Sequence, residues 1–240
     1  MIQISTNIYC DPLFENIDIE NKLLPNQYKE YPYLIIKNFF SYASCERLVQ
    51  LVQEDEETKR KAQVKKEVIS GIIQADVVEE YRKTNIYKLD ALYAKYYDDQ
   101  FIKYKSVMEE YFSVALTLST DVQVLEYKEG FFYIKHADDS SEIINKDKQT
   151  IGFKLVAPQR KLSTVLFATS HKTNVQNEAQ SFSGGELMFN YLYNSEGESV
   201  KIKPEAGDMI IFPSNPYFSH EVLPVESGYR LTLVQWHDTI

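Results

Sequence analysis

The stretch QVLEYKEGFFYIKHAD, residues 123–138, holds two segments of strand-forming residues with a Glu-Gly turn between them. The segments span 122–127 and 131–135, and His136 and Asp138 follow the second one. Side chains at positions i and i+2 of a strand point to the same face. This H-x-D pair at a strand end therefore presents an imidazole and a carboxylate to one point.

More short strands are expected along the second half of the chain, with proline and glycine residues between them. The segments with strand-forming composition are 162–169, 186–193, 199–203, 208–212 and 229–236. Many short strands separated by turns indicate a sandwich or a jelly roll. We expect a mainly β fold with flanking α-helices (α+β), built on a double-stranded β-helix core (jelly roll, cupin-like).

The first half of the chain has a helical pattern. Apolar residues keep helical spacing across 42–52 and 89–116, after a strand at 33–37. These patterns predict one domain, 1–240. Within it, residues 1–120 are expected to form a mostly helical support with a leading strand, and 121–240 the jelly-roll core.

Three polar segments show no strand pattern. Residues 139–149 and 170–183 are expected to be loops. The basic run 61–66 lies beside the acidic run 54–57, and both are interpreted as the solvated surface of a helix.

The charge balance argues against several classes of partner. The net charge is −9 and the isoelectric point about 5.1, whereas nucleic-acid binders usually carry a basic face. Cys10 and Cys45 form neither a CxxC pair nor a disulfide framework. The N-terminus has no signal-peptide pattern, and no apolar run is long enough to span a bilayer. We expect a cytoplasmic location, with no nucleic-acid and no membrane partner.

His136, Asp138 and His220 are the candidate metal ligands. His220 lies 82 residues after Asp138 in the sequence and directly follows a strand and a proline-rich turn. Two imidazoles and one carboxylate can form a facial triad that leaves positions open on ferrous iron. Taken alone, each of these elements also fits a surface pair or a core histidine, and the same ligand set can hold zinc.

Arg230 adds a second kind of candidate. It lies ten residues after His220, inside the apolar strand 229–236. A buried arginine is costly unless it is paired, and its planar fork suits a carboxylate. A dicarboxylate that binds iron at one end needs such a partner at the other. The alternative is an ion pair with an acidic residue of the chain itself.

The second half resembles the prolyl 4-hydroxylase type of Fe(II)/2-oxoglutarate oxygenase. Residues 123–138 are similar to the family motif Q-V-x-x-Y-x-x-G-x-x-Y-x-x-H-x-D, and residues 161–166 are similar to the strand that follows it. Three further segments resemble family motifs: 182–189 resembles F-x-G-G-x-x-x-F, 204–212 resembles P-x-x-G-x-x-x-x-F, and 220–230 resembles H-x-V-x-P-V-x-x-G-x-R. Trp236 stands where the family often has a tryptophan. The resemblance covers about 33–236 and is strong from Gln123 onward.

The resemblance implies a ligand and cofactor set. His136, Asp138 and His220 would bind Fe(II), and Arg230 would bind the distal carboxylate of 2-oxoglutarate, where many relatives have lysine. These four residues are the implied catalytic set. O₂ is the second co-substrate, and ascorbate is an optional reductant.

Four further residues are implied to contact the co-substrate. Tyr133 and Thr164 match positions that commonly hydrogen-bond the distal carboxylate. Thr232 shares a strand face with Arg230 and is expected to assist it. Trp236 is interpreted either as a wall of the cofactor site or as a core aromatic residue.

The remaining polar candidates are interpreted as structural. Asp139 is expected to be a loop residue and not a ligand. His171 is expected to be exposed in its loop, and His237 to have a structural role.

The implied reaction is hydroxylation of an unactivated C–H bond of a small-molecule, peptide or protein substrate. A peptidyl proline, a free amino acid and a small natural product all fit, and the loops 139–159 and 170–183 are expected to select among them. The carboxylate of Asp138 favours hydroxylation over halogenation, since related halogenases have a small residue there. The alternatives are a demethylase of the same superfamily, acting on nucleic acid or another substrate, and a non-enzymatic jelly-roll binding module.

Overall fold

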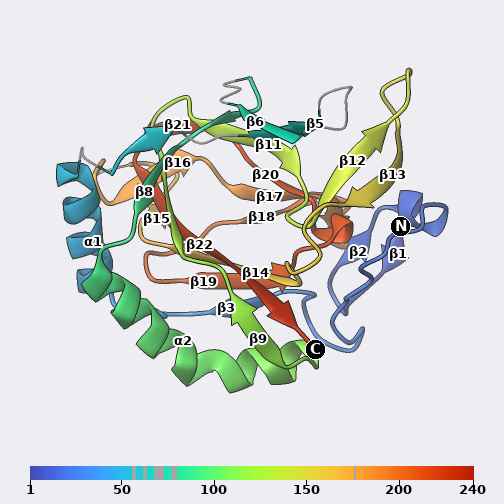
Figure 1. Ribbon diagram of the computed structural model, residues 1–240, viewed down its shortest axis with the longest axis horizontal. Coiled ribbons are helices and arrows are strands. Elements are labelled where there is room, and N and C mark those ends of the chain that lie inside the picture. The colour runs from blue at the N-terminus through green and yellow to red at the C-terminus, as the bar shows by residue number, and fades with distance from the viewer. Residues whose placement is uncertain (56–57, 62–63, 68–72, 77–79, 176) are drawn as a thin grey trace.

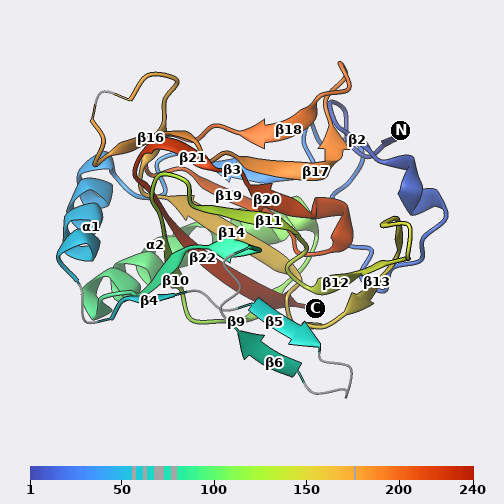
Figure 2. The ribbon, with the colours of Figure 1, turned by 90° about the horizontal axis from the view of Figure 1, so that it is seen from above.

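The computed structural model describes residues 1–240 except 56–57, 62–63, 68–72, 77–79 and 176. Two antiparallel sheets enclose a hydrophobic core between them (Figure 1, Figure 2). The major sheet has the order β3-β19-β14-β22-β10-β8-β4, with β9 beside β22. Its strands are β3 (Leu34–Ile36), β4 (Arg60–Lys61), β8 (Asn85–Lys88), β9 (Leu116–Ser119), β10 (Gln123–Tyr127), β14 (Leu162–Phe167), β19 (Met209–Pro213) and β22 (Arg230–Thr239).

The minor sheet has the order β1-β2-β17-β20-β11-β7, with β18 beside β17. Its strands are β1 (Ile2–Gln3), β2 (Tyr9–Cys10), β7 (Arg82–Lys83), β11 (Phe132–His136), β17 (Leu187–Tyr193), β18 (Ser199–Ile202) and β20 (His220–Val222). Three small sheets join β5 (Val64–Glu67) to β6 (Ile73–Asp76), β12 (Ser140–Ile144) to β13 (Thr150–Leu155), and β15 (Ser170–His171) to β16 (Ser181–Gly184) and β21 (Val225–Gly228). Short 3-10 turns occur at η1 (Pro12–Glu15) and η2 (Pro216–Phe218). The expected jelly roll is confirmed.

Two helices, α1 (Tyr42–Glu54) and α2 (Ala91–Phe112), lie on the outer side of the major sheet (Figure 1). Tyr97 and Met108 of α2 cluster with Leu231 and Leu233 of β22 in a second hydrophobic layer. The major sheet is thus covered on both faces, which explains why β14 and β19 are buried at every position. Among the described residues, no helix is both long and apolar enough to cross a membrane.

Local capping fixes where the helices begin and end. The Ser41 hydroxyl accepts the N–H of Ser44 at the start of α1, and the Asp90 carboxylate accepts the N–H of Leu92 at the start of α2. After α2 the chain turns at Ser113, whose φ of 55° is left-handed.

The expected strands of the second half are confirmed, each with bounds within three residues of the sequence prediction, and so are the strand at 33–37 and both helices. The first 120 residues also contain strands β1, β2 and β4 to β9, which no pattern indicated. Together with β3, strands β4, β8 and β9 join the major sheet, and β1, β2 and β7 join the minor sheet. Because the first half completes both sheets, we propose that residues 1–240 form one domain.

Two expectations for polar segments were wrong, and the loop expected at 170–183 was wrong only at its two ends. Segment 139–149 forms β12 and leads into β13, because Asn145 closes a hairpin turn by accepting the N–H groups of Asp147 and Gln149. Segment 170–183 carries β15 and β16 at its two ends. The described residues of the basic run 61–66 lie in β4 and β5 and not in a helix, and residues 62–63 lie outside the described part.

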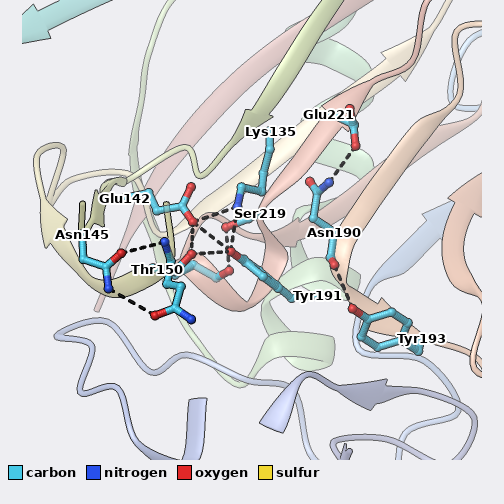
Figure 3. Close-up of polar contacts among 11 residues, drawn as sticks. Lys135, Glu142, Asn145, Thr150, Asn190, Tyr191, Tyr193, Ser219 and Glu221 are labelled. Atoms are coloured by element: carbon cyan, nitrogen blue, oxygen red, sulfur yellow. Dashed lines mark hydrogen bonds and ion pairs between the residues drawn. The ribbon is translucent and has the colours of Figure 1, made fainter. Parts of the chain in front are cut away.

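The β12–β13 hairpin is held against the minor sheet by a polar network (Figure 3). The Glu142 carboxylate accepts from Lys135 Nζ at 2.7 Å, from Tyr191 Oη at 3.0 Å and from the Thr150 hydroxyl. Lys135 Nζ also donates to Tyr191 Oη at 2.9 Å. These contacts connect the hairpin to β11 and β17, so the polar residues that suggested a loop instead anchor it.

His237, on β22, contacts both the neighbouring strand β9 and the helix α2, as expected for a structural histidine. Its Nδ1 lies 2.8 Å from the Ser119 hydroxyl, its Nε2 lies 3.1 Å from the Thr164 hydroxyl, and its ring stacks on Phe101 at 4.7 Å. Burial lowers the pKa of His237 to about 3. The ring is therefore neutral in the folded protein near neutral pH.

Acidification should reduce stability through His237. An unfolded histidine has a pKa of about 6.5, so between that value and about 3 the unfolded chain binds a proton that the folded ring does not. The free energy of unfolding then decreases as the pH falls through this window. From pH 7 to pH 5, we expect the wild type to lose about 2 kcal/mol more than a His237→Gln variant. Urea unfolding at both pH values measures this, and equal losses in the two proteins would contradict it.

Candidate metal and co-substrate site

The three candidate ligands converge at one end of the minor sheet. His136 ends β11 and His220 begins β20, and the two residues are direct partners in this strand pair. Asp138 Oδ1 lies 3.9 Å from His136 Nε2, and Asp138 Oδ2 lies 4.0 Å from His220 Nε2. One ligand atom from each residue lies within 4.8 Å of the others. This is a compact set of two imidazoles and one carboxylate, as the sequence predicted.

Backbone carbonyls orient both imidazoles. Nδ1 of His136 lies 2.9 Å from the carbonyl oxygen of Ile134, and Nδ1 of His220 lies 2.9 Å from that of Phe218. With Nδ1–H donating to these oxygens, each Nε2 keeps its lone pair toward Asp138. The ring of Tyr133 stacks on His136 with centroids 3.7 Å apart and holds the imidazole in its plane.

Electrostatics keep the ligands in the protonation states that a metal needs. Burial, reinforced by the nearby His220, lowers the pKa of His136 to about 3. Burial alone would raise the pKa of Asp138, but His220, His136 and the Ser163 hydroxyl outweigh it and lower that pKa. A neutral imidazole and an ionised carboxylate are the forms that bind cations.

Asp138 is fixed by a residue that sequence reasoning missed. The Ser163 hydroxyl, on β14, donates to Asp138 Oδ2 at 2.6 Å and lies 2.7 Å from the Ser214 hydroxyl. Arg160 Nη1 donates to the backbone carbonyl of Asp138 at 3.1 Å. The alternation of side chains along a strand could have identified Ser163, because a residue one position from Thr164 lies on the opposite face of the sheet.

The implied role of Thr164 is not supported by its position. Its hydroxyl lies 3.2 Å from Tyr97 Oη and 3.1 Å from His237 Nε2, among the residues that pack under α2. Thr164 therefore faces the outer side of the major sheet, while Ser163 faces the triad. The assignment was wrong because the resemblance fixed the strand but not which of its two faces each residue occupies.

Removing the Ser163 hydroxyl should weaken metal binding. A Ser163→Ala variant loses the hydrogen bond that orients Asp138, and partners of this kind change metal affinity by about 10–100-fold. Titration with Mn(II), followed by electron paramagnetic resonance, measures the dissociation constant. Ser141→Ala removes an exposed serine of β12 and serves as the control. Equal affinities in both variants would exclude this role for Ser163.

Arg230 lies at the bottom of the space between the sheets, 1% exposed. Its guanidinium carbon lies 4.7 Å from the ring centroid of Tyr127, 5.3 Å from that of Phe167 and 5.8 Å from that of Phe182. Its nearest hydrogen-bond acceptor is the Thr232 hydroxyl at 3.4 Å.

Arg230 forms no direct ion pair within the described part of the chain, and the Glu186 carboxylate acts on it only from a longer distance. Its Nε has no hydrogen-bond partner there, and no described carboxylate lies within 4.0 Å of its guanidinium. Burial lowers the pKa of Arg230 to about 10, so it stays charged at neutral pH. The alternative of an internal ion pair is therefore not found. A buried arginine without a carboxylate partner fits an anion, such as the distal carboxylate of 2-oxoglutarate.

Thr232 and Trp236 share the inner face of β22 with Arg230, as alternation along the strand requires. Thr232 contacts Arg230 directly. The ring of Trp236 stacks under the guanidinium of Arg160 at 3.8 Å, and its buried Nε1 has no partner among the described residues. Trp236 thus lies next to the residue that holds Asp138, which fits a wall of the site.

A different tyrosine lies beside each part of the site: Tyr133 beside the metal ligands and Tyr127 beside Arg230. Tyr133 stacks on His136, and the guanidinium carbon of Arg82 lies 4.5 Å from the centroid of the Tyr133 ring. The tyrosine beside Arg230 is Tyr127, which the motif included but to which no role was given. Tyr127 pairs directly with Arg230 across β10 and β22, so the sheet register brings the two together.

Asp139 lies outside the strands and is fully buried, and His171 is more buried than expected. Asp139 is 0% exposed and accepts from Asn21 Nδ2 at 2.8 Å and from the Ser140 hydroxyl at 2.6 Å. It is not part of the three-ligand set. His171 was expected to be exposed, but its Nε2 lies 3.1 Å from Glu186 Oε1 and its side chain is 8% exposed. The contacts with Asn21 and Glu186 come from other segments of the chain, which the local sequence does not reveal.

The site therefore combines two parts. One is a compact set of three metal ligands, which leaves positions on a metal ion for further ligands, and the other is a buried cation with no described carboxylate within 4.0 Å. Iron with a dicarboxylate co-substrate fits both parts at once. A zinc hydrolase would use the first part but has no need for the second.

The comparisons with known proteins agree with this reading. The model of the 2OG-Fe(II) oxygenase superfamily matches residues 122–238. A comparison with curated protein sequences finds no match.

Several solved structures are similar in fold. A prolyl hydroxylase from Trichoplax adhaerens, in complex with a hypoxia inducible factor oxygen degradation domain peptide fragment, has a TM-score of 0.59 at 21% identity over 86% of this chain and 83% of that one. A prolyl-4-hydroxylase from Pseudomonas putida has a TM-score of 0.54 at 20% identity over 86% and 91%. The viral collagen prolyl hydroxylase of Paramecium Bursaria Chlorella virus-1, as its 2OG complex, has a TM-score of 0.53 at 18% identity over 87% and 96%.

The matched half of the chain carries the complete triad and Arg230. The superfamily uses Fe(II), 2-oxoglutarate and O₂, and the fold is shared with prolyl hydroxylases. Residues 122–238 therefore match the 2OG-Fe(II) oxygenase superfamily, and the chain shares its fold with prolyl hydroxylases.

Proposed function

We propose that this chain hydroxylates an unactivated C–H bond and that its substrate is a prolyl residue within a peptide. The observation that carries the reaction type is the combination of the His136–Asp138–His220 set with Arg230, which has no carboxylate partner among the described residues. The carboxylate of Asp138 supports hydroxylation, because a halide site needs a small residue at that position.

Each residue of the site has a defined task in this proposal. His136, Asp138 and His220 hold Fe(II), and Arg230 with Thr232 binds the distal carboxylate of 2-oxoglutarate. The bound metal and co-substrate supply the oxidising power, by coupling oxidative decarboxylation of 2-oxoglutarate by O₂ to oxygen transfer. The aromatic rings around Arg230 exclude water from this end of the site, which strengthens the ion pair.

The substrate class is supported by the groups beside the triad. Two arginines lie beside the metal ligands: Arg82 over the ring of Tyr133, which also stacks on His136, and Arg160 over the ring of Trp236. Guanidinium groups can donate to peptide carbonyl oxygens, so these two arginines can hold a peptide chain next to the metal. Solved structures with this fold include a prolyl hydroxylase with a peptide bound.

The test is a turnover screen with Fe(II), 2-oxoglutarate and O₂. Proline-containing peptides, free amino acids and small natural products are compared by succinate release and by the gain of one oxygen atom in the product mass. Oxygen gain on a prolyl peptide, absent in a His220→Ala variant, is the expected result. Oxygen gain on free amino acids alone would reject the peptide substrate but retain the hydroxylase. The weak visible charge-transfer band of Fe(II)-bound 2-oxoglutarate, sought without O₂, must also appear, and its absence would reject the oxygenase reaction itself.

A further inference from the structure

A second cavity lies between the edge strands β3 and β18, away from the metal triad. Its volume is about 580 Å³, within the range of small-molecule sites. Neither the triad nor Arg230 lines it. Within the described part of the chain, β3 pairs only with β19, and β18 pairs only with β17. The cavity therefore opens between two sheet edges that no other described strand covers.

The inner end of this cavity is apolar and deep. Its floor is formed by Phe167 and Ile210, which are each 1% exposed, so the cavity reaches into the core of the sandwich. Tyr31, Tyr33 and Tyr111 line its sides, and the rings of Tyr31 and Tyr33 stack with centroids 5.4 Å apart. Such walls suit a flat apolar group.

The charge around the cavity is opposite to that of the whole protein. Four lysines and two acidic residues line it, a balance of +4 − 2 = +2, whereas the chain carries −9. Lys37 is paired with Asp208 at 2.6 Å. Lys201 and Lys203 form no ion pair with any described carboxylate. Two ammonium groups are therefore available at the β18 side of an otherwise aromatic cavity.

We propose that this cavity binds a small amphipathic anion. Its apolar, preferably aromatic, body enters toward Phe167 and Ile210, and its carboxylate, sulfonate or phosphate group pairs with Lys201 and Lys203. The depth of the cavity favours a compact molecule over an extended peptide, which would lie along the sheet edges without filling the floor. No triad residue lines the cavity, and its floor residue Phe167 also lies 5.3 Å from the guanidinium of Arg230, so the test is made with Arg230 occupied.

The test uses anilinonaphthalene sulfonate, a fluorescent aromatic anion, and N-phenylnaphthylamine, its neutral counterpart. Titrations are carried out with Mn(II) and saturating N-oxalylglycine, an analogue of 2-oxoglutarate, so that Arg230 is occupied. We expect one saturable site for the sulfonate and binding of the neutral probe that is weaker by about tenfold, because charge-assisted hydrogen bonds to the lysines are lost.

Variants locate the site. A Lys201→Ala/Lys203→Ala double variant is expected to bind the sulfonate about tenfold more weakly, and Lys201→Arg/Lys203→Arg to retain affinity. Lys103→Ala/Lys146→Ala removes the same charge from exposed positions elsewhere and is expected to bind like the wild type. Thermal unfolding of each variant verifies that it is folded.

Four results would overturn the proposal. Three are loss of sulfonate binding when N-oxalylglycine is added, equal affinity for the two probes, and equal affinity in the alanine and control double variants. A fourth is saturable binding of a glutamate-rich peptide in place of the probe, which would assign the cavity to an extended protein segment.

Discussion

An Asp138→Ala variant is expected to lose more than about 10³-fold in turnover, since it removes the anionic metal ligand and with it several kcal/mol of metal-dependent stabilisation. Both imidazoles remain oriented by the carbonyls of Ile134 and Phe218, so residual metal affinity is expected to be low but measurable. Succinate release and Mn(II) titration measure the two effects.

The control for this variant is Asp147→Ala, which removes an exposed carboxylate from the turn between β12 and β13. It changes net charge by the same amount and is expected to leave turnover and metal binding unchanged. Circular dichroism establishes that both variants are folded. Wild-type metal affinity in Asp138→Ala would contradict the ligand assignment.

An Arg230→Met variant is expected to change co-substrate affinity and stability in opposite directions. It removes the partner of the distal carboxylate, so 2-oxoglutarate binding should weaken by about 10²–10³-fold. It also removes a buried charge that forms no direct ion pair with a described carboxylate. The protein without co-substrate is therefore expected to gain about 1–3 kcal/mol in the free energy of unfolding.

This opposition separates a co-substrate ligand from a structural arginine. Urea unfolding and anaerobic 2-oxoglutarate titration are measured on the same preparations. Arg230→Lys is expected to retain most of the binding, and Arg47→Met, at an exposed position of α1, to change neither quantity. A large loss of stability in Arg230→Met would show that the guanidinium has a structural partner and would reject the proposed role.

The β-rich second half and the three metal ligands were predictable from the sequence because they depend on short-range order. Strand alternation places His136 and Asp138 on one face, and the turn residues mark where each strand ends. Arg230 was recognisable because a charged residue in an apolar strand needs a reason to be buried. Motif order then tied these pieces to one family.

The partners of these residues were decided by the register between strands, which no local pattern encodes. Register brings Tyr127 opposite Arg230 and directs Ser163, not Thr164, toward Asp138. A shift of one residue in pairing reverses every side chain, so a motif aligned in sequence cannot assign the face.

The sequence by itself determined the jelly-roll core, the three candidate metal ligands, and Arg230 as the candidate partner of an anion. Only the tertiary structure decided what surrounds them: the hairpin anchored by Glu142, the burial of His171, and the second cavity beside Lys201 and Lys203. The physical reason is the number of residues that separate two contacting side chains along the sequence. Periodicity reports neighbours a few residues apart, whereas these features join segments that meet only when both sheets have formed.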